Sequence, residues 1–371
     1  MGPCSAMVKA VAVGKPTGGS RRQSGGAGAW SHDDSERAFQ ADQSIAFYNV
    51  DAFLNSGPLY RPDQGGSPFN PRTEDEVPAT AGVSAIAAVV SLYFRNNPLA
   101  LAICLVECGG SDALVAQLQV ILDSSVTVYS SLGRGRRGHG VMTCVNNNHP
   151  DLPPVSVVAT APIKGVDSPI GVAGRVLTVR FDYKTSPLYV TACYAVAGGP
   201  HEGSDADKLV HSALSNIVEF VTPRHGAPCG RLLIGGDMNS VENPHTDRSP
   251  TQATTNPADT NPFRPQAALH HHGMHDAYRS QWMLGSQAHD YREHATYFSR
   301  LHSKVGQWSR IDRIYASPNM QVTYCDIAAP GFYIGTEDHR LIAVCFNTEC
   351  AAIGGPRFGT SKIRVKYLDT A

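Results

Sequence analysis

The segment RLLIGGDMNSVENPHTDR, at 231–248, constrains the fold more than any other part of the sequence. Its apolar residues, at 232–234, do not alternate with polar ones, which is typical of a strand buried on both faces. The glycines at 235–236 allow the backbone to turn sharply and to approach another group closely. Asp237 and Asn239 then follow at the C-terminal end of the strand, where open α/β sheets usually keep their sites.

Strand-like and helix-like stretches alternate along most of the chain. The predicted helices have apolar residues at helical spacing or are apolar throughout, and they lie at 83–95, 111–122 and 205–221. The predicted strands are β-rich apolar runs bounded by Gly and Pro, from 44–50 and 101–106 to the closing runs SRIDRIYAS and EDHRLIAVCF. Residues 249–265 are predicted to form an irregular loop. This order indicates an α/β protein in which two sheets pack together with helices outside.

The two ends of the chain differ in composition from its centre. Residues 1–43 are rich in Gly, Ser, Arg and Asp, which predicts a disordered arm, and 350–371 are expected to form a loosely ordered tail. The 371 residues are enough for two average domains, but one large α/β domain at 44–349 fits equally well.

Composition limits the partners and the compartment. Lys and Arg number 31 against 32 Asp and Glu, so nucleic-acid binding would have to come from a local basic patch. The nine cysteines form no C-x-x-C pair, which indicates reduced thiols in an intracellular protein of the nucleus or cytoplasm. The chain shows no secretion signal, and no apolar run approaches the roughly 18 residues of a membrane span, so a membrane partner is not expected.

Side chains with chemical potential gather at the ends of predicted strands. An Asp or Asn at such a place is usually a turn or cap residue, so any one of them alone is weak evidence of a site. Carboxylates, amides, a phenol and an imidazole together favour a catalytic site. These residues are Asn49, Asp51, Glu107, Tyr194, Asp237, Asn239, Asp312, Asp338 and His339.

The segments NVDAF, LVECGG, CYAVAG, GGDMNS, SRIDRIY and TEDH resemble, in order and spacing, the motifs of the endonuclease/exonuclease/phosphatase superfamily. The likeness covers 44–349 and rests on the combination of Gly-Asp-x-Asn, Arg-Ile-Asp and Asp-His. Within the superfamily the chain is most similar to the apurinic-type endonuclease domain of non-LTR retrotransposons, through Asp247-Arg248 and the runs HDAYRSQW and HATYFSR. The resemblance implies a four-layered α/β sandwich of two mixed sheets flanked by helices, with a phosphoesterase site at one edge.

Three positions depart from the usual family pattern. Val106, Val196 and Met238 stand where Gln, Pro and Phe are usual. None of the three is a reacting group, so the departures concern fine geometry and leave the chemistry complete.

The resemblance also implies roles for the strand-end residues. Glu107 is the expected ligand of Mg²⁺ or Mn²⁺, with Asp51 and Asp338 completing or supporting the shell. His339, paired with Asp312, is expected to act as a base or to bind the phosphate. The alternative for Asp312 is an ordinary surface ion pair with a neighbouring arginine in SRIDRIY.

The remaining groups are expected to address the water and the phosphate. Asp237 would orient or deprotonate the attacking water. Asn49, Asn239 and Tyr194 would donate hydrogen bonds to the charge that develops on the phosphoryl group. The two glycines of the opening segment would make room for the phosphate.

The implied function is a Mg²⁺-dependent phosphodiesterase, a DNA endonuclease of retrotransposon type that nicks one strand, leaves a 3′-hydroxyl and acts as a monomer on double-stranded DNA. One alternative keeps the fold and makes the protein a phosphatase of a lipid, inositol or nucleotide phosphate. SRIDR replaces the WCDR motif of inositol phosphatases and counts against that branch. Another is an inactive mobile-element remnant that only binds nucleic acid, against which the complete set of reacting groups argues.

Overall fold

The computed structural model describes residues 43–50, 79–109, 112–133, 140–158, 172–196, 205–222, 230–249, 257–281, 294–298, 307–328 and 339–348. The predicted arm up to residue 42 and the predicted tail lie outside these ranges. Among the described residues, no helix combines the length and the apolar character that crossing a bilayer requires.

The first sheet has six strands in the order β13-β14-β1-β2-β4-β3. β1 pairs with β2 in parallel and with β14 in antiparallel orientation, so the sheet is mixed. The strands are β1 (Gln43–Asn49), β2 (Ala100–Val106), β3 (Val126–Leu132), β4 (Gly140–Asn146), β13 (Val322–Ile327) and β14 (Ile342–Phe346).

The second sheet also has six strands, in the order β5-β6-β7-β8-β12-β9. β7 and β8 are parallel, and β12 runs antiparallel to β8. Its strands are β5 (Val155–Val157), β6 (Val176–Phe181), β7 (Leu188–Tyr194), β8 (Arg231–Asp237), β9 (His275–Asp276) and β12 (Asp312–Ala316). A small ladder joins β10 (Tyr297–Phe298) to β11 (Trp308–Ser309).

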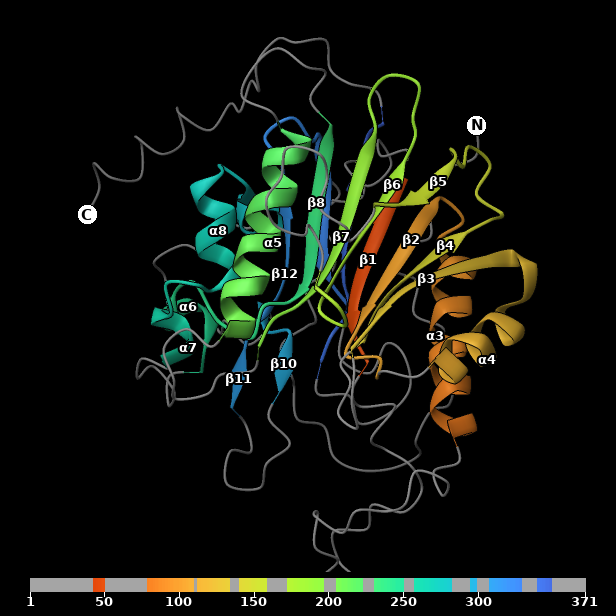
Figure 1. The fold of residues 1–371 in the computed structure, drawn as a ribbon, viewed down its shortest axis with the longest axis horizontal. Coiled ribbons are helices and arrows are strands. Elements are labelled where there is room, and N and C mark those ends of the chain that lie inside the picture. Colours follow the sequence, from red (N-terminus) through yellow and green to blue (C-terminus); the bar gives the residue numbers. More distant parts are fainter. Residues whose placement is uncertain are drawn as a thin grey trace, which may run out of the picture.

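Helices cover the outer face of each sheet (Figure 1). The first sheet carries α3 (Ala79–Asn96) and α4 (Asp112–Leu122), which is followed by a 3₁₀ turn at Asp123–Ser125. The second carries α5 (Asp205–Val221) and α8 (Pro265–His271), and the short helices α6 (Pro244–Asp247) and α7 (Pro257–Thr260) lie on this side of the molecule. α9 (Ala277–Gln281) instead places Ala277 and Tyr278 in the apolar cluster between the two sheets.

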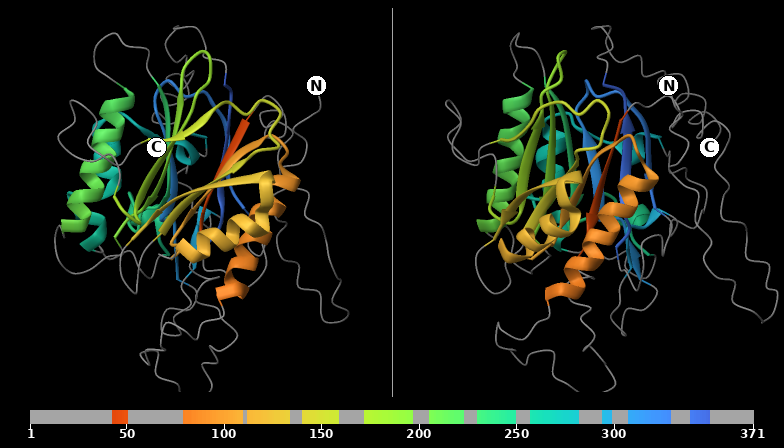
Figure 2. Two further views of the ribbon diagram at one scale, coloured as in Figure 1. Left: turned by 45° about the vertical axis from the view of Figure 1, so that its right-hand side comes forward. Right: turned by 90° about the vertical axis from the view of Figure 1, so that its right-hand side faces the viewer.

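Three apolar clusters hold the four layers together, and Figure 2 shows the layers from two further sides. Phe47 and Leu233, from opposite sheets, lie in the central cluster. Val90 of α3 joins the cluster behind the first sheet, and Ile217 of α5 joins the cluster behind the second. The predicted four-layered α/β sandwich is therefore confirmed.

Several elements were not predicted from the sequence, and β4 and α7 are two of them. β4 contains a short run with Thr143 and Cys144 at its centre, and it is fixed by pairing with both β2 and β3. α7 lies within the segment 249–265 that was predicted to be an irregular loop. Both depend on tertiary contacts more than on a strong local pattern.

The two glycines before Asp237 serve packing between the strands. A Cβ on Gly235 would stand 2.8 Å from ring atoms of Phe47 in the facing sheet. A Cβ on Gly236, whose φ is +131°, would lie 2.1 Å from the carbonyl oxygen of Cys193 in β7. The expectation that the glycines make room for phosphate is therefore wrong, because protein atoms already fill the space around them.

Substitution of Gly236 should accordingly destabilise the fold. We expect Gly236→Ala to lower the free energy of unfolding by about 3 kcal/mol or more, since it adds a backbone clash to an unfavourable φ. The control is Gly273→Ala, where φ is +74° but no atom lies within 4 Å of the new Cβ. The control should lose only about 1–2 kcal/mol. Equal losses in urea unfolding would show that the contact with Cys193 is unimportant.

Candidate functional site

Strand register brings several of the predicted site residues that the structure describes to one end of the two sheets. Parallel pairing of β7 with β8 places Tyr194 beside Asp237. Antiparallel pairing of β8 with β12 places Asp237 opposite Asp312. In the other sheet, Asn49 ends β1 beside the last residue of β2, and Glu107 follows directly.

Glu107 is held by donors from both sheets. Asn49 Nδ2 donates to Glu107 Oε2 at 2.9 Å, and Tyr194 Oη donates to Glu107 Oε1 at 2.8 Å. Glu107 itself has φ +60°, a left-handed conformation that is uncommon for a residue with a long side chain. Such outliers concentrate at functional sites, where the surrounding structure maintains them.

Asn49 connects the two sheets through their carboxylates. Besides its bond to Glu107, Asn49 Nδ2 donates to Asp237 Oδ2 at 3.0 Å. The amide is almost fully buried, at 1% exposure, so its two N–H groups are committed to these acceptors. In this arrangement Asn49 organises the carboxylates, and its predicted donation to a phosphate stays a prediction.

Asn239 stabilises the turn that follows β8. Its backbone N–H donates to Asp237 Oδ1 at 2.7 Å, and its Nδ2 donates to the carbonyl of Ala195 at 2.9 Å. Its φ of +49° is left-handed, which Asn tolerates better than most residues. The second N–H of this amide remains the group for its predicted donation to phosphate.

Two pKa values at the site are displaced upward. The pKa of Asp237 is raised to about 7, first by burial and second by the neighbouring Asp312 carboxylate, while His339 acts in the opposite direction. Burial also raises the pKa of Tyr194, as does the neighbouring Glu107 carboxylate. A carboxyl group that titrates near neutral pH suits a base that accepts a proton from water.

The pKa of Asp237 makes a prediction about stability. Because its folded-state pKa lies above the unfolded value, Asp237 contributes stability at acid pH that is lost as the pH rises to about 7. Each pKa unit corresponds to about 1.4 kcal/mol, so Asp237 should lower the free energy of unfolding by roughly 2–3 kcal/mol between pH 5 and pH 8. The Asp237→Asn protein should lack this decrease. Urea unfolding of the wild-type and Asp237→Asn proteins at both pH values in EDTA measures this difference. The same change in unfolding free energy with pH for both proteins would contradict it.

Asp312 and His339 form one hydrogen-bonded pair although 27 positions separate them. His339 Nδ1 lies 2.9 Å from Asp312 Oδ2, and both side chains are buried. The carboxylate fixes the orientation of the imidazole and supports its cation. The alternative in which Asp312 pairs with a neighbouring arginine on the surface is wrong, because Arg310 and Arg313 are buried and pair with other carboxylates.

Thr296 contacts Asp312, and Tyr297 contacts His339; neither residue was predicted to belong to the site. Thr296 Oγ1 accepts from the backbone N–H groups of Ile311 and Asp312, at 3.0 and 2.9 Å. The backbone of Tyr297 forms an isolated antiparallel β-bridge with that of His339, and the centroids of the two rings lie 4.9 Å apart. Both residues lie in HATYFSR, a run that contributed to the family likeness, although it held no predicted reacting group.

A second group of possible metal ligands lies beside Glu107. Ligating atoms of Asp237, Asp312 and His339 lie within 4.8 Å of one another. Asp312 Oδ1 is buried and has no hydrogen-bond partner among the residues described, so it offers an unused acceptor to a cation. Carboxylate oxygens suit Mg²⁺ and Mn²⁺, and imidazole is better suited to transition metals. Of the predicted set, Glu107 is in place, and Asp51 and Asp338 lie outside the described residues.

Comparison with known proteins identifies the fold. No known family profile and no curated protein sequence matches the chain. An AP endonuclease from Leishmania major superposes with a TM-score of 0.56 at 15% identity, over 82% of this chain and 87% of that one. An AP endonuclease from Archaeoglobus fulgidus superposes with a TM-score of 0.50 at 15% identity, over 82% of this chain and 99% of that one.

The endonuclease domain of TRAS1, a telomere-specific non-LTR retrotransposon, superposes with a TM-score of 0.46 at 13% identity, over 82% of this chain and 98% of that one. The two AP endonuclease superpositions show that the chain has the endonuclease/exonuclease/phosphatase fold, as its motifs predict.

Proposed function

We propose that this protein is a divalent-metal-dependent phosphodiesterase and, within that class, a DNA endonuclease of retrotransposon type that nicks one strand. The proposal rests on one observation. The strand register and the hydrogen bonds of Asn49 bring Glu107, Asp237 and the Asp312–His339 pair together. This set would supply a metal ligand, a carboxylate that activates water and an imidazole, which suit phosphodiester hydrolysis. The likeness to proteins described as AP endonucleases is consistent with this class of substrate.

Glu107 would hold a Mg²⁺ ion, with Asp51 and Asp338 completing or supporting its shell. When bound, the ion supplies positive charge to the phosphate oxygens and to the leaving group. Tyr194 and Asn49 keep the Glu107 carboxylate in place by donating to its two oxygens. The metal is therefore proposed to enter a site whose principal ligand is already oriented.

Asp237 is proposed to accept a proton from the attacking water. Burial raises its pKa toward neutral pH, and the charge of a bound metal ion would lower that pKa again. The reaction rate should rise with pH as this carboxyl group ionises. Asn239, held by Asp237 and Ala195, is proposed to donate its remaining N–H to the phosphoryl oxygen.

His339 is proposed to bind the phosphate, with Asp312 holding its ring. Asp312 Oδ2 lies 2.9 Å from Nδ1 and so orients the imidazole ring. The imidazolium form donates a hydrogen bond and carries a charge, and both stabilise the extra negative charge of the transition state.

Substrate choice is tested with DNA and an inositol phosphate in parallel. The purified protein with Mg²⁺ should convert supercoiled plasmid into nicked circles, and DNA affinity should fall steeply with salt because binding depends on phosphate contacts. An inositol polyphosphate should release no phosphate under the same conditions. Intact plasmid together with phosphate release would replace the nuclease proposal with the phosphatase alternative.

A further inference from the structure

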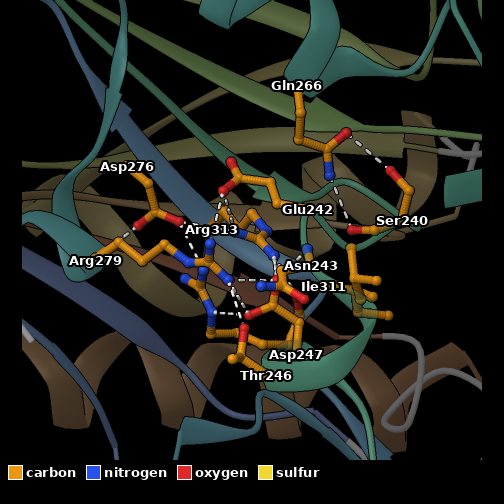
Figure 3. A network of polar contacts seen from close by, with 12 residues as sticks. Ser240, Glu242, Asn243, Thr246, Asp247, Gln266, Asp276, Arg279, Ile311 and Arg313 are labelled. Carbon is orange, nitrogen blue, oxygen red and sulfur yellow. Dashed lines mark hydrogen bonds and ion pairs between the residues drawn. The ribbon is translucent and has the colours of Figure 1, made fainter. Parts of the chain in front are cut away.

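A second polar cluster lies buried beside the candidate site, and the mechanism proposed above does not use it (Figure 3). It consists of equal numbers of carboxylates and guanidinium groups, so its charges balance. We call it the arginine–carboxylate network, and its members are Glu242, Asp247, Asp276, Arg279, Arg310 and Arg313.

Arg310 and Arg313 share the same two carboxylates. Arg313 Nη2 lies 2.7 Å from Asp247 Oδ2, and Arg313 Nη1 lies 2.8 Å from Asp276 Oδ2. Arg310 Nε lies 3.1 Å from Asp247 Oδ1, and Arg310 Nη2 lies 2.8 Å from Asp276 Oδ2. Both guanidinium groups are therefore held in fixed orientations by paired contacts.

Arg279 and Glu242 close the network at its edge. Arg279 Nη2 lies 2.7 Å from both oxygens of Asp247, and the Arg279 backbone N–H donates to Asp276 Oδ1 at 3.0 Å. Glu242 Oε2 lies 3.4 Å from both Arg279 Nη1 and Arg313 Nη1. The side chain of Arg279 is 26% exposed, whereas those of Arg313 and Asp247 are fully buried.

The network holds the chain on both sides of Asp312. Arg310 and Arg313 flank this residue, and Arg313 Nη2 donates to the Arg310 carbonyl at 3.2 Å. The Arg310 backbone N–H donates to the Asp247 carbonyl at 2.8 Å. Asp247 is the last residue of α6, a helix in the segment that follows Asp237 and Asn239. The contacts therefore connect the two neighbouring strands that carry Asp237 and Asp312 at their ends.

Stability alone is a weak explanation for a buried cluster of this kind. Ion pairs lose much of their attraction to desolvation, and apolar residues of similar volume often stabilise a fold equally well. Ion pairs of fixed geometry do specify the relative position of the segments they join. Although burial opposes the ionisation of Asp247, Arg313, Arg310 and Arg279 hold the pKa of that carboxyl well below its usual range, so the contacts persist across the working pH.

We propose that the arginine–carboxylate network is a positioning unit for Asp312: it fixes segment 310–313 against α6 and α9, so that Asp312 holds His339 toward the substrate. The effect of this positioning on catalysis rests on the proposed function. The placement of Asp312 by the network is a claim about structure that can be measured without activity.

The test compares two buried arginines that differ in what they contact. Arg313→Lys keeps the charge and removes the fork that binds Asp247 and Asp276. Arg248→Lys is the matched control, since Arg248 is also buried and pairs with Asp259 at 2.9 Å, outside the network. We expect Arg313→Lys to lower kcat by about 100-fold with KM unchanged, as a displacement near 1 Å would, and Arg248→Lys to leave kcat unchanged.

Amide hydrogen exchange gives the readout that does not depend on catalysis. The N–H of Asp312, which donates to Thr296 Oγ1, should exchange faster in Arg313→Lys than in Arg248→Lys at equal global stability. Equal kcat values for the two variants, or equal exchange of the Asp312 amide, would overturn the proposal. If the wild-type protein cuts no DNA, the proposed function fails, and the exchange result still decides the positioning role.

A milder variant covers the case in which Arg313→Lys does not fold. Arg279→Lys alters the network at its exposed edge, where a folded protein is expected. It should lower kcat less than Arg313→Lys but in the same direction, and it should speed exchange of the Asp312 amide. A folded Arg279→Lys protein with neither change would also overturn the proposal.

Discussion

Glu107→Gln is expected to lower the rate of Mg²⁺-dependent nicking by roughly 10²–10³-fold, because metal stabilisation of the transition state is worth several kcal/mol. The change removes one anionic ligand while it keeps the size of the side chain. The Gln carbonyl can still accept the hydrogen bond from Tyr194, which should preserve the turn after β2. Activity measured over a Mg²⁺ series separates a weaker metal site from a damaged fold.

The matched control is Glu219→Gln, on the exposed face of α5. It removes the same charge far from the candidate metal ligands and should leave the rate unchanged. If Glu107→Gln nicks DNA at the wild-type rate in saturating Mg²⁺, Glu107 is not a metal ligand. Partial recovery at high Mg²⁺ is the pattern expected for a ligand whose loss weakens affinity.

The second large effect concerns Asp312 and His339 as a pair. General acid–base groups contribute about 10²–10⁴-fold, and residues that act as a unit lose most of this when either one is removed. Asp312→Asn, His339→Ala and the double variant should therefore show similar losses of nicking rate. Independent losses that add in free energy would contradict a joint role despite the 2.9 Å contact between the side chains.

Much of the fold could be predicted because its strands are buried on both faces. The run before Gly235 and the run at 101–106 are apolar without interruption, which distinguishes them from surface strands. β4 escaped prediction because its pairing with two neighbouring strands, more than its own short sequence, makes it a strand. The local sequence pattern also did not predict the left-handed φ of Glu107, which the surrounding contacts explain.

The candidate site was predicted in part, through the order of its motifs. That order placed Asp312 with His339, and the structure brings the two side chains together. The arginines of SRIDRIY were considered only as alternative surface partners of Asp312, since charged residues are rarely fully buried unless paired. Their partner Asp247 lies 63 and 66 positions away, a separation that no local pattern reveals.

The most direct test of the central claim is a nicking time course on supercoiled plasmid with the wild-type protein in Mg²⁺ and in EDTA. We predict nicked circles in Mg²⁺ that prime extension by a DNA polymerase, as a 3′-hydroxyl would, and no nicking in EDTA. Plasmid that stays supercoiled in Mg²⁺, or nicks that form equally in EDTA, would contradict a metal-dependent phosphodiesterase built on Glu107, Asp237 and the Asp312–His339 pair.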